Sequence, residues 1–140
     1  MRIVIDTNIW ISGLLWRGKA WQLLKLAEQR KMELCIAYSM LLELEEVLSY
    51  EKFLPRLKVL QQTPEQLASY ALSISSIFDV SRSGIPIIYD DPDDDIFLLC
   101  AVEADATHIV SNDRHLLNLK SYQGIKIVTI DQFLNQDIDS

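Results

Sequence analysis

The chain has 140 residues, of which 49% are hydrophobic, and carries a formal net charge of −7. This size and composition predict one globular domain over residues 1–140 with a substantial core. The acidic balance argues against a protein that holds nucleic acid mainly through a broad basic surface. It fits better with a cluster of carboxylates that needs divalent cations, with a few basic residues or a basic partner protein contacting any polyanion.

The start of the chain does not read as a secretory signal, because Arg2 and Asp6 interrupt the apolar stretch that such a signal needs. No later apolar run approaches the length that spans a membrane. We therefore expect a soluble, cytoplasmic protein without a membrane contact. Cys35 and Cys100 lie in apolar segments, and two cysteines alone make neither a disulfide framework nor a four-ligand zinc site, so we interpret them as buried thiols.

Strand-like and helix-like segments alternate along the chain. The apolar and β-branched runs predict strands at residues 2–5, 34–37, 85–89, 108–110 and 125–130. Helical spacing of apolar residues, together with capping signals, predicts helices at residues 19–30, 40–50 after a Ser39 cap, 64–77 after a Thr63 cap, 94–104 and 115–119. This alternation predicts the α/β class, as a three-layer α/β/α sandwich with a mainly parallel central sheet.

Two acids follow predicted strands directly. Asp6 comes after the strand at residues 2–5, and Asp113 follows the strand at 108–110 through the turn Ser111-Asn112. Ligands of open parallel sheets bind outside the carboxyl ends of the strands, so both acids are expected at the functional edge. The alternative is that such polar residues only satisfy loop amides and start helices.

Residues 90–95 hold five aspartates, and helix geometry separates their roles. Asp94 lies on the same stripe as Phe97, Leu98 and Ala101, which predicts that it points inward. Asp95 is turned by about 100° from that stripe and is expected to reach solvent. Helix capping and the helix dipole are the alternative explanation for an aspartate in a first turn.

The helix after Ser39 offers a further acid, but its geometry leaves two candidates. Glu43 and Glu45 both lie on the borders of the apolar stripe, and either could be an ordinary solvated glutamate. Several carboxylates in one pocket repel one another, and a divalent cation removes that conflict. An all-oxygen ligand set suits Mg²⁺ or Mn²⁺ rather than zinc.

Four segments in this order resemble the PIN-domain nucleases, in particular the branch found as toxins of toxin-antitoxin systems. They are IVIDTN at residues 3–8, SMLLEL at 39–44, DPDDDIFL at 91–98 and ATHIVSNDRHLL at 106–117. The resemblance covers nearly the whole chain. It implies a metal-dependent ribonuclease that hydrolyses RNA phosphodiester bonds, with an antitoxin partner and a homodimeric state.

The resemblance also assigns residues. It implies that Asp6, Glu43, Asp94 and Asp113 form the acidic quartet that binds Mg²⁺ or Mn²⁺, which favours Glu43 over Glu45. It implies supporting roles for Asn8, Ser111 and Asn112. In the crowded acidic run, Asp91 or Asp95 could share the role of Asp94. Arg114 could contact phosphate or simply begin a solvated helix. Trp10, Trp16 and Trp21 could stack on RNA bases, although core or dimer contacts are the commoner use of such side chains.

Two other functions remain open from the sequence. A DNA or structure-specific nuclease would use the same acids, and the sequence does not separate it from a ribonuclease. A non-catalytic acidic α/β module, such as a receiver-like domain, would bind protein or metal. A receiver should show paired acids after its first strand, whereas only Asp6 follows that strand here.

Overall fold

The computed structural model describes residues 1–80 and 95–136. Its centre is a six-stranded sheet with the order β3-β2-β1-β4-β6-β5. All neighbours in the sheet are parallel except β5 and β6. The strands are β1 (Arg2–Ile5), β2 (Glu33–Ala37), β3 (Ser75–Phe78), β4 (His108–Val110), β5 (Ser121–Tyr122) and β6 (Ile125–Val128). The expected mainly parallel sheet is present.

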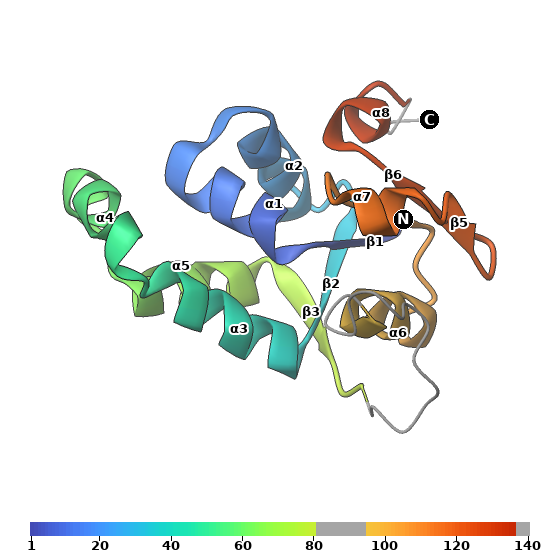
Figure 1. Ribbon diagram of the computed structural model, residues 1–140, viewed down its shortest axis with the longest axis horizontal. Coiled ribbons are helices and arrows are strands. Elements are labelled where there is room, and N and C mark those ends of the chain that lie inside the picture. The colour runs from blue at the N-terminus through green and yellow to red at the C-terminus, as the bar shows by residue number, and fades with distance from the viewer. Residues whose placement is uncertain (81–94, 137–140) are drawn as a thin grey trace.

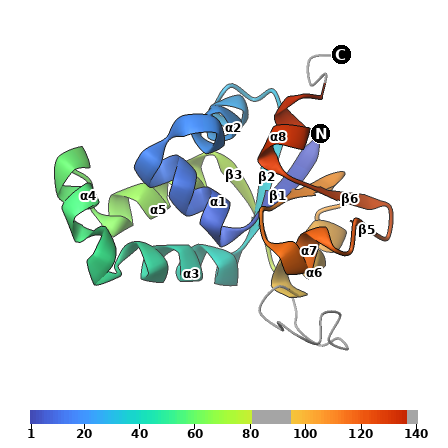
Figure 2. The same cartoon turned by 45° about the horizontal axis from the view of Figure 1, so that its top comes forward.

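Helices connect the strands and cover both faces of the sheet. They are α1 (Thr7–Ile11), the π-helix η1 (Ser12–Trp16), α2 (Gly18–Glu28), α3 (Tyr38–Leu48), the 3₁₀-helix η2 (Glu51–Phe53), α4 (Leu54–Leu60), α5 (Pro64–Ser73), α6 (Asp95–Glu103), α7 (Arg114–Leu117) and α8 (Ile130–Leu134). Figures 1 and 2 show α2 and α8 on one side of the sheet and α6 on the other. The fold is therefore the three-layer α/β/α sandwich expected from the sequence.

Burial along β1 shows that both faces are covered. Successive side chains of a strand point to opposite faces, yet Ile3, Val4 and Ile5 are all at most 1% exposed. An apolar run without alternation is what a central parallel strand requires. Within the described residues, Cys35 and Cys100 are free, buried thiols, as expected. No described helix is both long and apolar enough to cross a membrane.

Three expectations for secondary structure were wrong. Helix α5 does not reach residue 77, because residues 75–78 form β3 beside β2. Ser39 does not cap α3: the helix begins at Tyr38 directly after β2, with Ala37 at the cap position. The last strand ends at Val128, since Thr129 caps α8 through a bond from the Gln132 amide. The strand expected at residues 85–89 lies outside the described residues.

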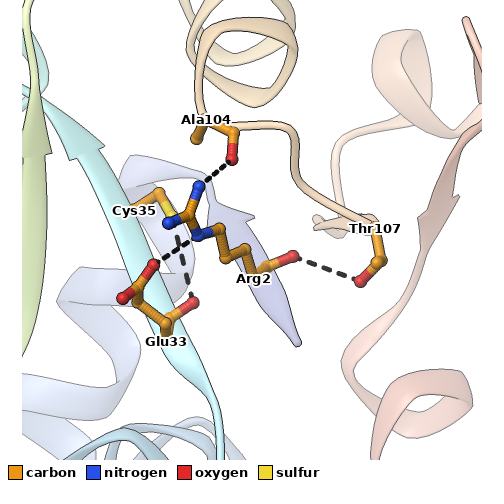
Figure 3. Close-up of polar contacts among 5 residues, drawn as sticks. All are labelled: Arg2, Glu33, Cys35, Ala104 and Thr107. Carbon is orange, nitrogen blue, oxygen red and sulfur yellow. Dashed lines mark hydrogen bonds and ion pairs between the residues drawn. The ribbon is translucent and has the colours of Figure 1, made fainter.

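A polar network joins β1, β2 and α6 at the amino edge of the sheet (Figure 3). The Arg2 guanidinium donates to the carbonyl oxygen of Ala104 at 2.9 Å and pairs with the Glu33 carboxylate at 2.6 Å. The Thr107 hydroxyl donates to the Arg2 carbonyl at 3.2 Å. These contacts hold the amino end of β1 against β2 and α6, and Asp6 follows the opposite end of the same strand.

Candidate active site

The sheet reverses its direction of winding at β1, and this places a crevice at its carboxyl edge. From β1 the chain moves outward to β2 and β3, then returns to β4 on the other side of β1. Chain segments leaving β1 and β4 therefore separate, and ligands of open α/β sheets bind at such a point. Asp6 follows β1 there, and Ser111 follows β4.

Asp6 ends β1 and begins α1. Its Oδ1 accepts a hydrogen bond from the Ile9 amide at 2.8 Å, which makes it the N-cap of the helix. Its own amide donates to the Val110 carbonyl at 3.3 Å, so the backbone of Asp6 is also tied to β4. The residue is only 4% exposed. A carboxylate is thus held at the boundary between the core and the carboxyl edge.

Ser111 links Asp6 to the next acid. Its side chain is fully buried, and its hydroxyl donates to Oδ2 of Asp6. The hydroxyl oxygen of Ser111 also accepts a hydrogen bond from the Asp113 amide at 2.9 Å. The hydroxyl therefore uses its donor and one acceptor position, and it fixes the Asp6 carboxylate and the Asp113 backbone relative to each other.

Asp113 is half-buried and caps α7. Its Oδ1 accepts from the His115 amide at 2.7 Å, as capping aspartates do. Arg114 begins this short helix and is exposed, as is His115. The alternative that polar residues here satisfy loop amides is therefore correct for one oxygen of each acid, but it does not explain why the two acids are brought together.

The two acids open into one cavity of about 130 Å³. The cavity also exposes Asn8 and Asn112, two of the three residues expected to support the site, while Ser111 lies directly behind them as the bridge. Its lining consists of Asp6, Asn8, Ile9, Ser12, Asn112 and Asp113. Segments more than 100 residues apart in the chain thus meet in a small polar hollow.

Burial raises the pKa of the Asp6 carboxyl above its usual value of 3.8, and the nearby charge of Asp113 raises it further. The hydrogen bonds from Ser111, Ile9 and Asn112 act in the opposite direction, because they stabilise the ionised form. The burial effect is the largest of these. Among the described residues, the groups around Asp6 thus do not fully offset the cost of burying its charge, as expected where a cation binds between carboxylates.

Glu43 approaches the same edge from α3. Its side chain is exposed, and its Oε2 accepts from the Thr7 hydroxyl at 3.5 Å. Thr7 directly follows Asp6 in the chain. Glu45 is half-buried, and its carbonyl oxygen accepts from the Ser49 hydroxyl within α3. Of the two glutamates that the sequence left open, Glu43 is thus the one beside the segment that carries Asp6.

The acidic run enters the described structure only at its last residue. Asp91 and Asp94 lie outside the described residues, whereas Asp95 begins α6. Asp95 is 8% exposed, so the expectation that it would reach solvent was wrong. The reason is that α6 packs against β1, β2 and β4 and buries almost its whole first two turns, which leaves no solvated side for Asp95.

The donor set suits a hard cation. The cavity presents carboxylate, amide and hydroxyl oxygens and no cysteine or histidine, and oxygen ligands are those that Mg²⁺ and Mn²⁺ prefer. Within residues 1–80 and 95–136, however, no three acidic, histidine or cysteine side chains are grouped closely enough to hold a metal ion.

Two polar residues of this region were not anticipated. Thr7 contacts Glu43, and Ser12 lines the cavity. Ser12 follows Asn8 by four positions with three apolar residues between them, which is the spacing of one helix face. That signal was present, but only a helix directly after Asp6 makes it meaningful.

Comparison with known proteins agrees with this geometry. The PIN domain family matches residues 2–115. The crystal structure of VapBC2 from Rickettsia felis bound to a DNA fragment from their promoter contains a chain of the same fold, with a TM-score of 0.60 and 18% sequence identity over 92% of this chain and 98% of that one. No curated protein matches the chain. Since the family match extends over most of the sequence and includes the segments that carry Asp6, Glu43, Ser111 and Asp113, the chain belongs to the PIN domain family.

Proposed function

We propose that this PIN domain is a metal-dependent endoribonuclease that hydrolyses RNA phosphodiester bonds and acts as the toxin of a toxin-antitoxin pair. One observation supports the chemistry above all others. A buried Asp6, held by Ser111 and with a raised pKa, faces Asp113 in a polar cavity at the point where the sheet reverses direction. Two carboxylates in such a place are costly unless they serve a cation.

The proposed metal ligands are Asp6, Asp94 and Asp113, with Glu43 binding directly or through a water molecule. A Mg²⁺ or Mn²⁺ ion held there would activate a water molecule, neutralise phosphate charge and stabilise the leaving oxygen. Ser111 and the Ile9 amide would hold the Asp6 carboxylate in one orientation. Asp91 and Asp95 are the alternatives to Asp94, and Arg114 is an exposed cation that could contact phosphate beside Asp113.

The proposed biological role is supported by the likeness of fold to a chain of VapBC2, which was solved bound to a DNA fragment from its promoter. We infer that this chain has an antitoxin partner that blocks the cavity, and that it forms a homodimer in the cytoplasm. A net charge of −7 would also favour association with a basic partner protein through electrostatic attraction. Co-purification with the product of an adjacent gene, and inhibition of cleavage by that protein, would test the pairing.

The central test compares Asp6→Asn with a matched control. Asp105→Asn makes the same chemical change at an exposed aspartate at the other edge of the sheet, where its positive φ of 54° suits asparagine as well as aspartate. Purified wild-type protein and Asp105→Asn should cleave single-stranded RNA with Mg²⁺ or Mn²⁺ and not with EDTA. Asp6→Asn should not cleave it. Glu43→Gln, Asp94→Asn and Asp113→Asn should each lower the rate.

A binding measurement accompanies the cleavage assay. At a Mn²⁺ concentration of about 100 times its Kd, wild-type protein should gain about 2.7 kcal/mol of stability, and Asp6→Asn much less. Equal cleavage by wild type and Asp6→Asn would refute the site. Cleavage of DNA but not RNA would instead assign a DNA nuclease, and metal binding without cleavage of either would assign a non-catalytic binding module.

A further inference from the structure

A second, larger cavity of about 410 Å³ adjoins the first. The two cavities share Ser12 and Asn112, so their walls are continuous. The second is lined further by the side chains of Trp16, Arg17, Lys19 and Asp131. We call this surface the strand groove and define it by Trp16, Arg17, Lys19 and Asn112. It extends from the candidate active site toward the start of α2.

The fold positions the strand groove rigidly relative to Asp6. Helix α1, capped by Asp6, continues without interruption into η1, which ends at Trp16. Single-turn π-helical segments within α-helices are frequent at functional sites. The guanidinium of Arg56 donates from Nε to the Leu15 carbonyl at 2.6 Å and fixes the end of η1. From Thr7 to Trp16 the helical path is about 14 Å long at about 1.5 Å per residue, a distance that covers a few nucleotides.

The strand groove contains side chains of the types that bind single-stranded nucleic acid, namely an aromatic ring and basic groups. Trp16 is 53% exposed, and its described ring contact is an edge contact with Phe53 at 5.7 Å, so the indole is neither core nor solvent-shielded. The Arg17 guanidinium lies 5.3 Å over the Trp21 ring. Among the described residues no carboxylate pairs with it, which leaves its charge available to a phosphate.

Lys19 differs from Arg17, because its ammonium is paired with Asp131 at 2.5 Å. The pair is well exposed, with side-chain exposures of 63% and 64%, so its attraction is weak and a phosphate can compete for the lysine. Asp131 itself would repel a phosphate. In a chain with a net charge of −7, this groove is unusual because it combines an exposed indole, a lysine and an arginine that has no carboxylate partner among the described residues.

We propose that the strand groove binds the RNA strand next to the scissile phosphodiester, with one base stacked on Trp16 and a phosphate bound by Arg17. This inference rests on the proposed ribonuclease function. Proteins bind a single strand by stacking its bases on aromatic side chains and by placing basic side chains beside its phosphates. Both kinds of side chain occur here, in a cavity that adjoins the one lined by Asp6 and Asp113. Lys19 contributes once a phosphate displaces Asp131.

Binding is tested without cleavage, in an Asp6→Asn background with EDTA present. Fluorescence anisotropy with a labelled single-stranded RNA of ten nucleotides gives the affinity and its dependence on salt. Trp16→Ala should weaken binding about 5- to 150-fold, the range that the loss of one stacked base implies. Trp16→Phe, which keeps a ring, should retain most of the affinity and also excludes a folding defect as the cause.

The charge variants give an independent measurement. Arg17→Gln should reduce the slope of log K against log salt by about 0.7, the value for one phosphate contact on a single strand. Lys126→Gln removes the same charge at the amino edge of the sheet, where Lys126 is exposed beside His108, and should leave the slope unchanged. Asp131→Asn should tighten binding, because it releases Lys19 and removes a repelling charge.

Cleavage by the otherwise wild-type chain supplies the last readout. Trp16→Ala should raise KM and leave kcat nearly unchanged with long RNA, and it should have no effect on a dinucleotide, which is too short to reach Trp16. Equal affinities of Trp16→Ala and its parent, or equal losses for Trp16→Ala and Trp16→Phe, would overturn the inference. So would a change of oligomeric state in Trp16→Ala, since Trp16 would then contact a second copy.

The two proposals fail in different ways. If wild-type protein cleaves RNA but the Trp16 and Arg17 variants behave like their parents, the strand groove is refuted and the ribonuclease function stands. If no RNA is cleaved by wild-type protein, the proposed function fails, whatever the anisotropy measurements give.

Discussion

Replacing Ser111 by alanine should remove the bridge between Asp6 and Asp113. The hydroxyl of Ser111 is fully buried, donates to the Asp6 carboxylate and accepts from the Asp113 amide. In Ser111→Ala the Asp6 carboxylate loses a donor and the Asp113 amide loses its acceptor. Only a water molecule could replace the missing hydroxyl. The Asp6 carboxylate retains its hydrogen bonds from the Ile9 and Asn112 amides.

The expected cost follows from the two lost bonds. A hydrogen bond to a charged group is worth about 1.5–3 kcal/mol and a neutral one about 1 kcal/mol, so Ser111→Ala should destabilise the fold by roughly 2–4 kcal/mol. For a chain of this length that is a fall in Tm of about 10 °C. Because the hydroxyl lowers the pKa of Asp6, it favours the ionised carboxylate, and the loss should be larger at neutral than at acidic pH.

Urea denaturation at two pH values measures this effect. Ser12→Ala is the matched control, since Ser12 lines the same cavity but is exposed. It should change stability by less than about 0.5 kcal/mol, as ordinary surface substitutions do. A Ser111→Ala protein as stable as wild type, or a loss no larger at neutral pH than at acidic pH, would refute the account of the bridge. Ser111→Ala should also weaken Mn²⁺-induced stabilisation, because Asp6 loses its fixed orientation.

Three further outcomes are expected. Gly13→Ala should cost about 1–3 kcal/mol in chemical denaturation, because a Cβ there would lie 2.8 Å from Leu24 Cδ1 and 3.2 Å from the backbone of α2. Burial lowers the pKa of His108 below its usual 6.5, so the unfolded chain binds this proton more readily and stability should fall as the pH drops below about 6.5; His108→Gln should remove that part of the pH dependence. Burial raises the thiol pKa of Cys35 to about 11 and of Cys100 to about 12, so alkylation at about pH 8 should follow unfolding; rapid labelling of the native protein would contradict this.

The central part of the fold was predictable because its signals are local. Residues 2–5 and 108–110 are unbroken apolar runs that end at polar residues, and both became neighbouring strands. The start of α5 was predicted from Thr63, Pro64 and Gln66, and the capping box that they imply is present. The convergence of Asp6 and Asp113 followed from the rule that parallel strands end at a common edge.

Other features depend on contacts between distant segments. Residues 75–78 continue the apolar spacing of α5, and they form a strand only because β2 offers a parallel partner, with Leu34 opposite Ser75. Helix periodicity assigned Asp95 to solvent, but the packing of α6 against three strands buries it. The choice of Glu43 over Glu45 required the resemblance to a family, since both lie on the borders of one helix face.

The order of the strands has a consequence for synthesis of the chain on the ribosome. β1 pairs with β2 soon after both have emerged, but its other edge waits for β4, since Ile3 lies opposite His108. Until then the nascent chain exposes an apolar strand edge, the kind of surface that invites misassembly and that chaperones shield. Asp6 likewise lacks Ser111 until translation has passed residue 111. The two acids of the small cavity, Asp6 and Asp113, therefore come together only late in synthesis, after β4 and the turn that follows it have been made.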